Sequence, residues 1–543
     1  MILTQESAVT LMPVLLKNGQ MDGSFCGGRG GCGRCVVQFL EGAPLPTGLE
    51  RSRLEPEELR QGYRLACVTR PKTDCTIRIV RSEEKETPIV TEITLLSEGI
   101  DLNGQRNNLS VNQKSSAMKS CSPENADIEK NVRYIIAVDL GTTTIAMQMR
   151  DAETGNVTDT YCEMNPQRKY GTDVLARIQA SVEGQGEELR RLVCGAVLRG
   201  LGQFAKNLHG EILCMCVAGN TAMEHLLLGY DAVSLGRAPF MPVEKGLQKI
   251  TAARLFAGME NSEESLCVRG IGTDFDFPVY IAPCISAFVG GDIVAGLYVL
   301  GLLSPRHLKS GEPSGKVEGT AEPSDDGCYE KTPMSGQQTV LFIDLGTNGE
   351  MAITDGRRMI VTATAAGPAF EGDGTVIGTD RIALTARLLQ RGILDETGLL
   401  EEPYFTEGVR VENGKEDGSY FKQEDIRSLQ MAKAAIRAGV EILWEEMGRP
   451  EIGKICLAGG FGYYLDVEAA VVIGLLPAYM RGRVQAVGNT SLAGAYELGR
   501  GLSANRMDAA GLDGRTAFAE SINLAEMERF EELYLKYMNL EES

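Results

Sequence analysis

Histidine and tryptophan are scarce in this chain of 543 residues, which has three histidines and one tryptophan. With so few histidines, we do not expect a catalytic site built on a serine–histidine or cysteine–histidine pair. No apolar run approaches the roughly 18 residues that a membrane span needs. The first twenty residues lack a basic segment leading into a continuous apolar stretch. We therefore expect no signal peptide, no membrane segment and a cytoplasmic location.

Positive charge is also in short supply, because 54 Lys and Arg residues face 74 Asp and Glu residues, for a net charge of −20. A nucleic-acid-binding surface should be basic, so we expect no nucleic-acid partner. Residues 1–80 differ from the rest, with ten basic and eight acidic side chains. The remainder of the chain thus carries about −22, which indicates that the first 80 residues form a separate module.

Two polar stretches divide the chain further. Within the first 80 residues, the pattern predicts a helix over 9–19 and strands over 35–42 and 76–81. The predicted organisation is a small module (1–80), a linker (81–131), a first lobe (132–307), a disordered insertion (308–338) and a second lobe (339–543).

An internal repeat links the two predicted lobes. The segments "IIAVDLGTTTIA" (135–146) and "LFIDLGTNGEMA" (341–352) share an apolar strand, an Asp, a Gly/Thr turn and a returning strand. Glycine in such a turn allows the backbone to approach a phosphate closely. An Asp at the end of each first strand suits Mg²⁺, which prefers oxygen ligands. The repeat therefore predicts a duplicated, two-lobed body that binds a nucleotide.

This body resembles the actin-like ATPase superfamily, whose other motifs correspond to "CISAFVGGDIVAG" (284–296), "LAGGFG" (457–462) and "GNTSLAGA" (488–495). The resemblance implies an α/β, ribonuclease H-like fold in two lobes. By analogy, Asp139 and Asp344 order Mg²⁺ and the attacking water. The remaining nucleotide-binding positions implied by the resemblance are Gly141, Thr142, Thr143, Thr144, Gly346, Thr347, Asn348, Gly459, Gly460 and Phe461.

Two further acidic residues have less certain assignments. Asp292 is a candidate for a further water-orienting carboxylate, and the alternative is a residue of the first helical turn that the helix dipole stabilises. Glu350 follows the second phosphate turn, and we expect it at the surface or at the lobe interface. His225 and the cysteines Cys214, Cys216 and Cys456 lie in apolar segments. We expect them to be structural.

Three cysteines and five glycines fall within "SFCGGRGGCGRC" (24–35), in the spacing C-x5-C-x2-C. Cys26, Cys32 and Cys35, with Cys67 as the fourth ligand, suit a 2Fe–2S cluster, because glycines let backbone N–H groups point at its sulfurs. Zinc is the main alternative, but zinc sites usually use two C-x2-C pairs or histidine. Cys75 is the other candidate for the fourth ligand, but the surrounding sequence "DCTIRIV" predicts that it lies in a strand.

The cysteine spacing resembles the ferredoxin module of the adrenodoxin type, a small α+β domain. Such modules usually open with a β-hairpin, whereas only 25 residues precede Cys26 here. We therefore expect either that this hairpin is missing or strongly reduced, or that the true start of the chain lies upstream of Met1.

The chain as a whole resembles the ATP-dependent reductive activators of corrinoid proteins. The shared segments include "MNPQRKYGTDVLARI" (164–178), "VAGNTAMEHLLLG" (217–229), "APFMP" (238–242), "AAGPAFEG" (365–372) and "QEDIRSLQMAKAAIRAG" (423–439). The resemblance implies one-electron transfer from the cluster to Co(II), which regenerates Co(I) for methyl transfer with ATP as the driving ligand. It also implies a corrinoid protein as partner and an upstream low-potential reductant, and it is compatible with a homodimer.

Two other functions remain open from the residues alone. A small-molecule kinase of the actin-like superfamily would use the nucleotide motifs but would have no need of the four cysteines. An electron carrier or regulatory module whose cleft no longer turns over ATP would use the cysteines alone. ATP turnover that depends on a sugar or acid and is indifferent to replacement of the four cysteines would support the kinase. ATP hydrolysis by the wild type and by Asp344→Ala tests the module without turnover, because an equally silent pair means no ATPase.

Overall fold

The structure is a computed structural model. It describes residues 2–3, 10–11, 15, 35–51, 54, 56–71, 75–79, 132–259, 276–303, 338–370, 378–411 and 419–542. The calls on Cys26, Cys32, the linker and nearly all of the predicted insertion lie outside these residues. Among the described residues, no helix combines the length and the apolar composition needed to cross a membrane.

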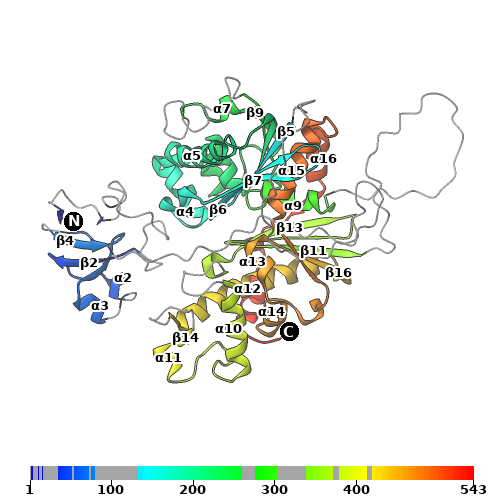
Figure 1. The fold of residues 1–543 in the computed structure, drawn as a ribbon. Coiled ribbons are helices and arrows are strands. Elements are labelled where there is room, and N and C mark those ends of the chain that lie inside the picture. Colours follow the sequence, from blue (N-terminus) through cyan, green and yellow to red (C-terminus); the bar gives the residue numbers. More distant parts are fainter. Residues whose placement is uncertain are drawn as a thin grey trace, which may run out of the picture.

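The N-terminal residues form a four-stranded antiparallel sheet in the order β1-β4-β2-β3 (Figure 1). Its elements are β1 (Ile2–Leu3), β2 (Val36–Glu41), α2 (Gly48–Arg51), α3 (Pro56–Arg60), β3 (Tyr63–Leu65) and β4 (Cys75–Ile79). The strands predicted over 35–42 and 76–81 are thus confirmed as β2 and β4. Leu11 and Leu15 are helical and buried in the core of this module. The first strand, β1, has two residues.

A six-stranded sheet, order β7-β6-β5-β8-β10-β9, forms the centre of the first lobe. Strands β7, β6 and β5 are antiparallel neighbours, whereas β5, β8 and β10 run parallel. The strands are β5 (Val132–Leu140), β6 (Thr144–Asp151), β7 (Val157–Met164), β8 (Gly210–Gly219), β9 (Gln248–Thr251) and β10 (Pro278–Ile281). The helices are α4 (Val174–Ala180), α5 (Gly186–Phe204), α6 (Thr221–Leu228), α7 (Ala252–Leu255) and α9 (Gly291–Val299).

The second lobe repeats this arrangement in a sheet of order β17-β16-β11-β12-β13-β18. Here β11, β12 and β13 are antiparallel and β11, β16 and β17 are parallel, so the predicted duplication is confirmed. The strands are β11 (Thr339–Leu345), β12 (Asn348–Thr354), β13 (Met359–Ala365), β16 (Ile452–Ala458), β17 (Val484–Gly488) and β18 (Ala519–Ser521), with a separate hairpin of β14 (Val409–Val411) and β15 (Ser419–Phe421). The helices are α10 (Gly378–Gln390), α11 (Tyr404–Glu407), α12 (Gln423–Glu446), α13 (Gly459–Tyr464), α14 (Val467–Val472), α15 (Thr490–Ser503), α16 (Ala509–Thr516) and α17 (Glu528–Lys536).

Helices α9 and α15 cross between the two sheets (Figure 1) and share one core with both of them. Leu492 and Leu498 of α15 pack with Ile135 of β5 and Phe342 of β11. The crossing is close, because a Cβ at Gly494 would overlap the backbone of Ala295. Helix α15 therefore follows β17 of the second lobe in sequence and packs on the sheet of the first.

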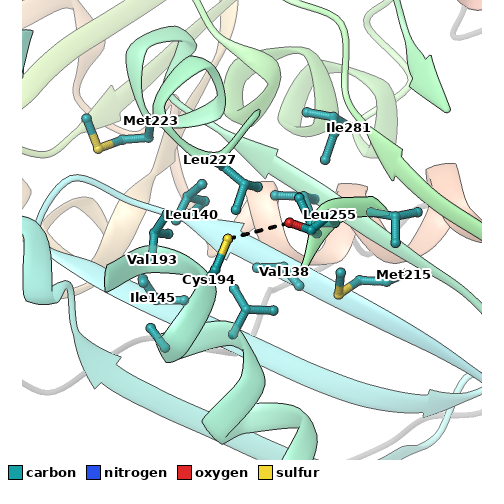
Figure 2. Packing of buried hydrophobic residues seen from close by; sticks show 14 of the residues in the cluster. Val138, Leu140, Ile145, Val193, Cys194, Met215, Met223, Leu227, Leu255 and Ile281 are labelled. Carbon is teal, nitrogen blue, oxygen red and sulfur yellow. Dashed lines mark hydrogen bonds between the residues drawn. The ribbon is translucent and has the colours of Figure 1, made fainter. Parts of the chain in front are cut away.

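The outer face of the first sheet packs on α5 and α6. Cys194 of α5 lies among Val138, Leu140 and Ile145 in this core, and its thiol lies 3.8 Å from the carbonyl oxygen of Leu255 (Figure 2). Burial raises the pKa of Cys194 to about 11, so this thiol is a packing group. The thiols expected to be structural are buried as well: Cys214, Cys216 and Cys456.

Candidate functional site

The two predicted phosphate loops meet in the structure. The first is the turn between β5 and β6, and the second is the turn between β11 and β12. The hydroxyl oxygens of Thr143 and Thr347 lie 3.2 Å apart, although 204 positions separate them in sequence. Asp139 and Asp344 each occupy the next-to-last position of their strands. The duplicated hairpins thus bring both turns and both carboxylates together where the two lobes meet, and this meeting place is called the cleft below.

The predicted adenosine motif lies beside the second loop. Strand β16 pairs parallel with β11, so that Ala458 is the partner of Asp344. Gly459 follows with φ of +80°, and a Cβ there would overlap the Asp344 carboxylate and lie 2.9 Å from the Leu345 carbonyl oxygen. Only glycine fits this close approach. Phe461 stacks on Phe370, with 4.7 Å between the ring centroids.

The three predicted catalytic carboxylates interact with one another. Burial, together with the charges of Asp292 and Asp139, raises the pKa of Asp344 to about 8. The pKa of Asp292 rises to about 7, mainly through burial and also through Asp139. The Ile293 N–H donates to Asp292 Oδ1 at 2.8 Å, and Asp292 lies in the first turn of α9, the position that its structural alternative requires. Its electrostatic interaction with Asp139 also places it near the other predicted catalytic carboxylates. A divalent cation would relieve the repulsion among these groups.

The cleft also contains two acidic residues that were not predicted to be catalytic. Glu350 pairs with Asp344 across β11 and β12 and is 7% exposed, so of its two expected locations the surface is wrong. Its interaction with Asp292 of the first lobe agrees with the other location, the lobe interface. Glu224 of α6 is 4% exposed and accepts the Gly219 N–H at 3.1 Å. Burial and the charge of Asp292 raise the pKa of both carboxyls well above the usual range. The apolar contexts of their segments gave no signal for this convergence.

Asp139 is held by the N-terminal turn of α15, a contact that the sequence did not predict. Asn489 Nδ2 donates to one carboxylate oxygen and Ser491 Oγ to the other, both at 2.8 Å. Burial raises the pKa of Asp139, and these two hydrogen bonds offset part of the rise. The helix that crosses between the lobes therefore orients a carboxylate of the first lobe.

Two of the four predicted cluster ligands lie within the described residues, and they are neighbours. The sulfurs of Cys35 and Cys67 are 3.1 Å apart, and both side chains are buried. Two thiolates on one tetrahedral metal lie roughly 3.8 Å apart, for bonds of about 2.3 Å. The pair thus fits a shared iron after a small separation of the sulfurs. Cys75 is a buried residue of β4, opposite Leu3 of β1.

A buried carboxylate fixes the loop that carries Cys67. Glu50 Oε1 accepts the Leu65 N–H at 3.0 Å and the Thr69 hydroxyl at 2.5 Å, and Oε2 accepts the Thr47 N–H at 2.7 Å. Burial alone would raise the pKa of Glu50, but these hydrogen bonds outweigh burial and lower it. Glu50 therefore remains ionised and holds both sides of the Cys67 turn.

His225 has the structural role expected of it. The Val243 N–H donates to Nε2 at 3.0 Å, so the proton of the neutral ring is on Nδ1, which lies 2.8 Å from the Thr221 carbonyl oxygen. Burial lowers the pKa of this imidazole. The Nε2 atom thus ties α6 to the loop that carries Val243, and Nδ1 bonds within the first turn of α6 itself.

Three family models match separate parts of the chain. "RACo middle region" matches residues 134–304, and "C-terminal domain of RACo the ASKHA domain" matches residues 338–383 and 375–543. "2Fe-2S iron-sulfur cluster binding domain" matches residues 3–72. Together with the strand orders, these matches confirm the predicted fold class, a two-lobed actin-like body with a small ferredoxin-like domain at its N-terminal side.

Known proteins resemble the chain over most of its length. Corrinoid activation enzyme RamQ of Eubacterium limosum is 26% identical, and the matched region covers 67% of this chain and 63% of that protein. The Co(II) methylated amine-specific corrinoid protein reductase of Methanosarcina barkeri is 25% identical over 74% of this chain and 76% of its own. A solved structure described as "Reductive activator for corrinoid,iron-sulfur protein" has the same fold, with a TM-score of 0.60, 24% identity and coverage of 99% and 96% of the two chains.

Proposed function

Because the chain belongs to the family of reductive activators of corrinoid proteins, whose middle and C-terminal regions together match most of residues 134–543, we propose that it reduces a corrinoid protein from Co(II) to Co(I) in an ATP-dependent reaction. Its partners are then a corrinoid protein and an upstream low-potential reductant.

One observation carries this proposal, namely that the chain combines a thiol pair suited to iron with two phosphate loops in contact. Cys35 and Cys67 lie 3.1 Å apart, and Thr143 and Thr347 lie 3.2 Å apart. A kinase would need the two phosphate loops but not the cysteine pair, and an electron carrier would need the cysteine pair but not the phosphate loops. The combination suits an electron transfer that requires ATP.

The N-terminal module is the proposed electron source. A bound 2Fe–2S cluster supplies one electron at a time, and its proposed ligands are Cys26, Cys32, Cys35 and Cys67. Glu50 would keep the Cys67 turn in place when the cluster is oxidised or reduced, since three of its hydrogen bonds are charge-assisted.

The cleft is the proposed ATP and Mg²⁺ site. Asp139 and Asp344 would hold Mg²⁺ through water, with Asp292 orienting the attacking water. Gly459, Gly460 and Phe461 would flank the adenosine. Each 59 mV of unfavourable potential difference lowers the equilibrium constant of a one-electron transfer about tenfold. ATP can offset this cost through a conformational change that its binding favours. The contacts of α15 with Asp139 provide a link from cleft occupancy to lobe position.

An anaerobic titration tests the proposed function. The iron-loaded, reduced chain is mixed with a Co(II) corrinoid protein from the same host, and the corrinoid absorbance is followed with and without Mg-ATP. We expect Co(I) to accumulate when Mg-ATP is present. Equal accumulation without nucleotide, or none with every corrinoid protein of the host, would contradict the proposal.

A matched pair of variants tests the ligand assignment. Cys67→Ser should lose the iron and the visible absorbance of the cluster, whereas Cys75→Ser should keep both, because Cys75 packs within a strand. The reverse result would make Cys75 the fourth ligand.

A further inference from the structure

Three carbonyl groups of the first phosphate loop are held by a single neighbouring segment of the chain, 164–178. Asn165 Nδ2 donates to the Gly141 carbonyl at 2.9 Å, and Arg177 Nη2 donates to the Thr142 carbonyl at 2.5 Å. The backbone N–H of Asn165 donates to the Thr143 carbonyl at 2.8 Å. Three consecutive carbonyls of the turn thus accept hydrogen bonds from two residues of the segment 164–178.

These bonds determine which way the loop presents its N–H groups. In a planar trans peptide the C=O and the following N–H point in opposite directions. Fixing the carbonyls of Gly141, Thr142 and Thr143 on the segment 164–178 therefore aims the N–H groups of Thr142, Thr143 and Thr144 away from that segment. The Thr143 hydroxyl contacts Thr347 of the second loop, so the turn lies where the two loops meet, and backbone N–H donors there suit a phosphate.

The two side chains are themselves fixed. Asn165 is 1% exposed, and its Oδ1 accepts the Gln167 N–H at 3.0 Å, which caps the short helix at 166–170. Arg177 is fully buried on α4, with Nε donating to the Gly171 carbonyl at 3.0 Å and Nη1 lying 3.0 Å from Met223 Sδ. Neither side chain can swing away without breaking these other contacts.

We propose that Asn165 and Arg177 are positioning residues that set the first loop for the phosphates of the nucleotide. This inference rests on the proposed function, because it assumes that the cleft binds ATP. The guanidinium of Arg177 also polarises the peptide between Thr142 and Thr143, since hydrogen bonds in a chain strengthen one another. The Thr143 N–H thereby becomes a stronger donor toward a phosphate oxygen.

Nucleotide affinity of the full chain tests the proposal. Titration calorimetry with the Mg²⁺ complex of a non-hydrolysable ATP analogue compares wild type with Arg177→Met, and adenosine serves as a ligand without phosphates. We expect Arg177→Met to bind the analogue about tenfold more weakly, since a charge-assisted bond to the loop is lost. Its affinity for adenosine should stay within about twofold of wild type, a split that general loosening of the lobe would not produce.

Arg190→Met is the matched control. Arg190 donates to the carbonyls of Leu255 and Ala257 at 2.6 and 3.3 Å, in the same lobe but away from the loop. The Arg190→Met substitution should lower the melting temperature of the chain without changing its affinity for the ATP analogue. Equal affinities of Arg177→Met and wild type for the analogue would overturn the inference, as would an equal loss with Arg190→Met.

A second variant covers the case in which Arg177→Met does not fold. Asn165→Asp keeps an oxygen for the Gln167 N–H but replaces the donor to Gly141 with an acceptor. Asn165→Asp should also lower the affinity for the ATP analogue about tenfold while leaving the affinity for adenosine unchanged. An affinity for the analogue equal to that of wild type would overturn the inference. A wild type that binds no nucleotide would instead overturn the proposed function itself.

Discussion

Asp344 lies near Asp292 and Asp139, and burial together with the charges of these two carboxylates raises its pKa to about 8. Between the ordinary pKa near 3.9 and this value, the folded chain holds a proton that the unfolded chain releases. Raising the pH through this window therefore favours unfolding. Below the window both states are protonated, and above it the effect levels off.

Replacing Asp344 with Asn removes this titration, so the variant should be more stable than wild type in metal-free buffer. The gain in melting temperature should be small at pH 5 and grow to several degrees by pH 8.5. ATP hydrolysis should fall about 100-fold or more, because a charge that stabilises the transition state is lost. Melting curves at several pH values check the sign.

Adding Mg²⁺ provides the control for the comparison of wild type with Asp344→Asn. At pH 8.5 it should raise the melting temperature of wild type and leave that of Asp344→Asn nearly unchanged. A variant that is less stable than wild type at pH 8.5 would show that Asp344 is not under electrostatic strain.

Glu50 is the second residue whose contacts make a distinct prediction. Glu50→Gln places an amide where two carboxylate oxygens now accept three hydrogen bonds, so at least one donor becomes unpaired. We expect a loss of about 1–3 kcal/mol in the stability of the module and faster loss of iron during gel filtration. Iron and sulfide assays after anaerobic reconstitution measure this loss.

Glu57→Gln is the matched control, because Glu57 is exposed on α3 and pairs with Arg60 at the surface. It should retain iron as wild type does. Equal iron loss from both variants would mean that the Cys67 turn does not depend on Glu50.

At the scale of elements, the crossing of α9 and α15 depends on small residues. Gly494→Ala would overlap the backbone of Ala295, whereas a Cβ at Gly514 of α16 meets no atom within 4 Å. We expect Gly494→Ala to destabilise the chain by about 1–3 kcal/mol and to lower ATP hydrolysis, since α15 carries Asn489 and Ser491. Denaturant unfolding and a hydrolysis assay measure both effects.

Gly514→Ala should be neutral or slightly stabilising, because alanine loses less conformational freedom than glycine in a helix. If Gly494→Ala and Gly514→Ala destabilised the chain equally, the cause would be a general effect of alanine in a helix and not the close approach of α9 and α15.

The sequence predicted those parts of the fold and site that depend on local pattern. The phosphate hairpins have apolar strands and a Gly/Thr turn within a dozen residues, and the structure brings Asp139 and Asp344 to one cleft. Contacts between distant segments had no such signal. Asn489 reaches Asp139 across 350 positions, and Glu224 lies in an apolar helical segment that did not indicate its approach to Asp292. Tertiary packing decides both.

At the scale of the whole molecule, the chain joins two parts of opposite charge. The first 80 residues carry a small positive excess, and the remainder about −22. The parts also differ in chemistry, since one has the paired thiols and the other the facing phosphate loops. Our account requires them to act in one reaction, in which nucleotide in the cleft allows an electron to leave the N-terminal module.

A single-turnover stopped-flow experiment tests this requirement most directly. The pre-reduced chain is mixed anaerobically with a Co(II) corrinoid protein and Mg-ATP while absorbance follows the cluster and the corrinoid together. The account predicts that the cluster is oxidised and Co(I) appears at the same rate, one for one, only with nucleotide. Co(I) formation without oxidation of the cluster, or at the same rate without nucleotide, would contradict it.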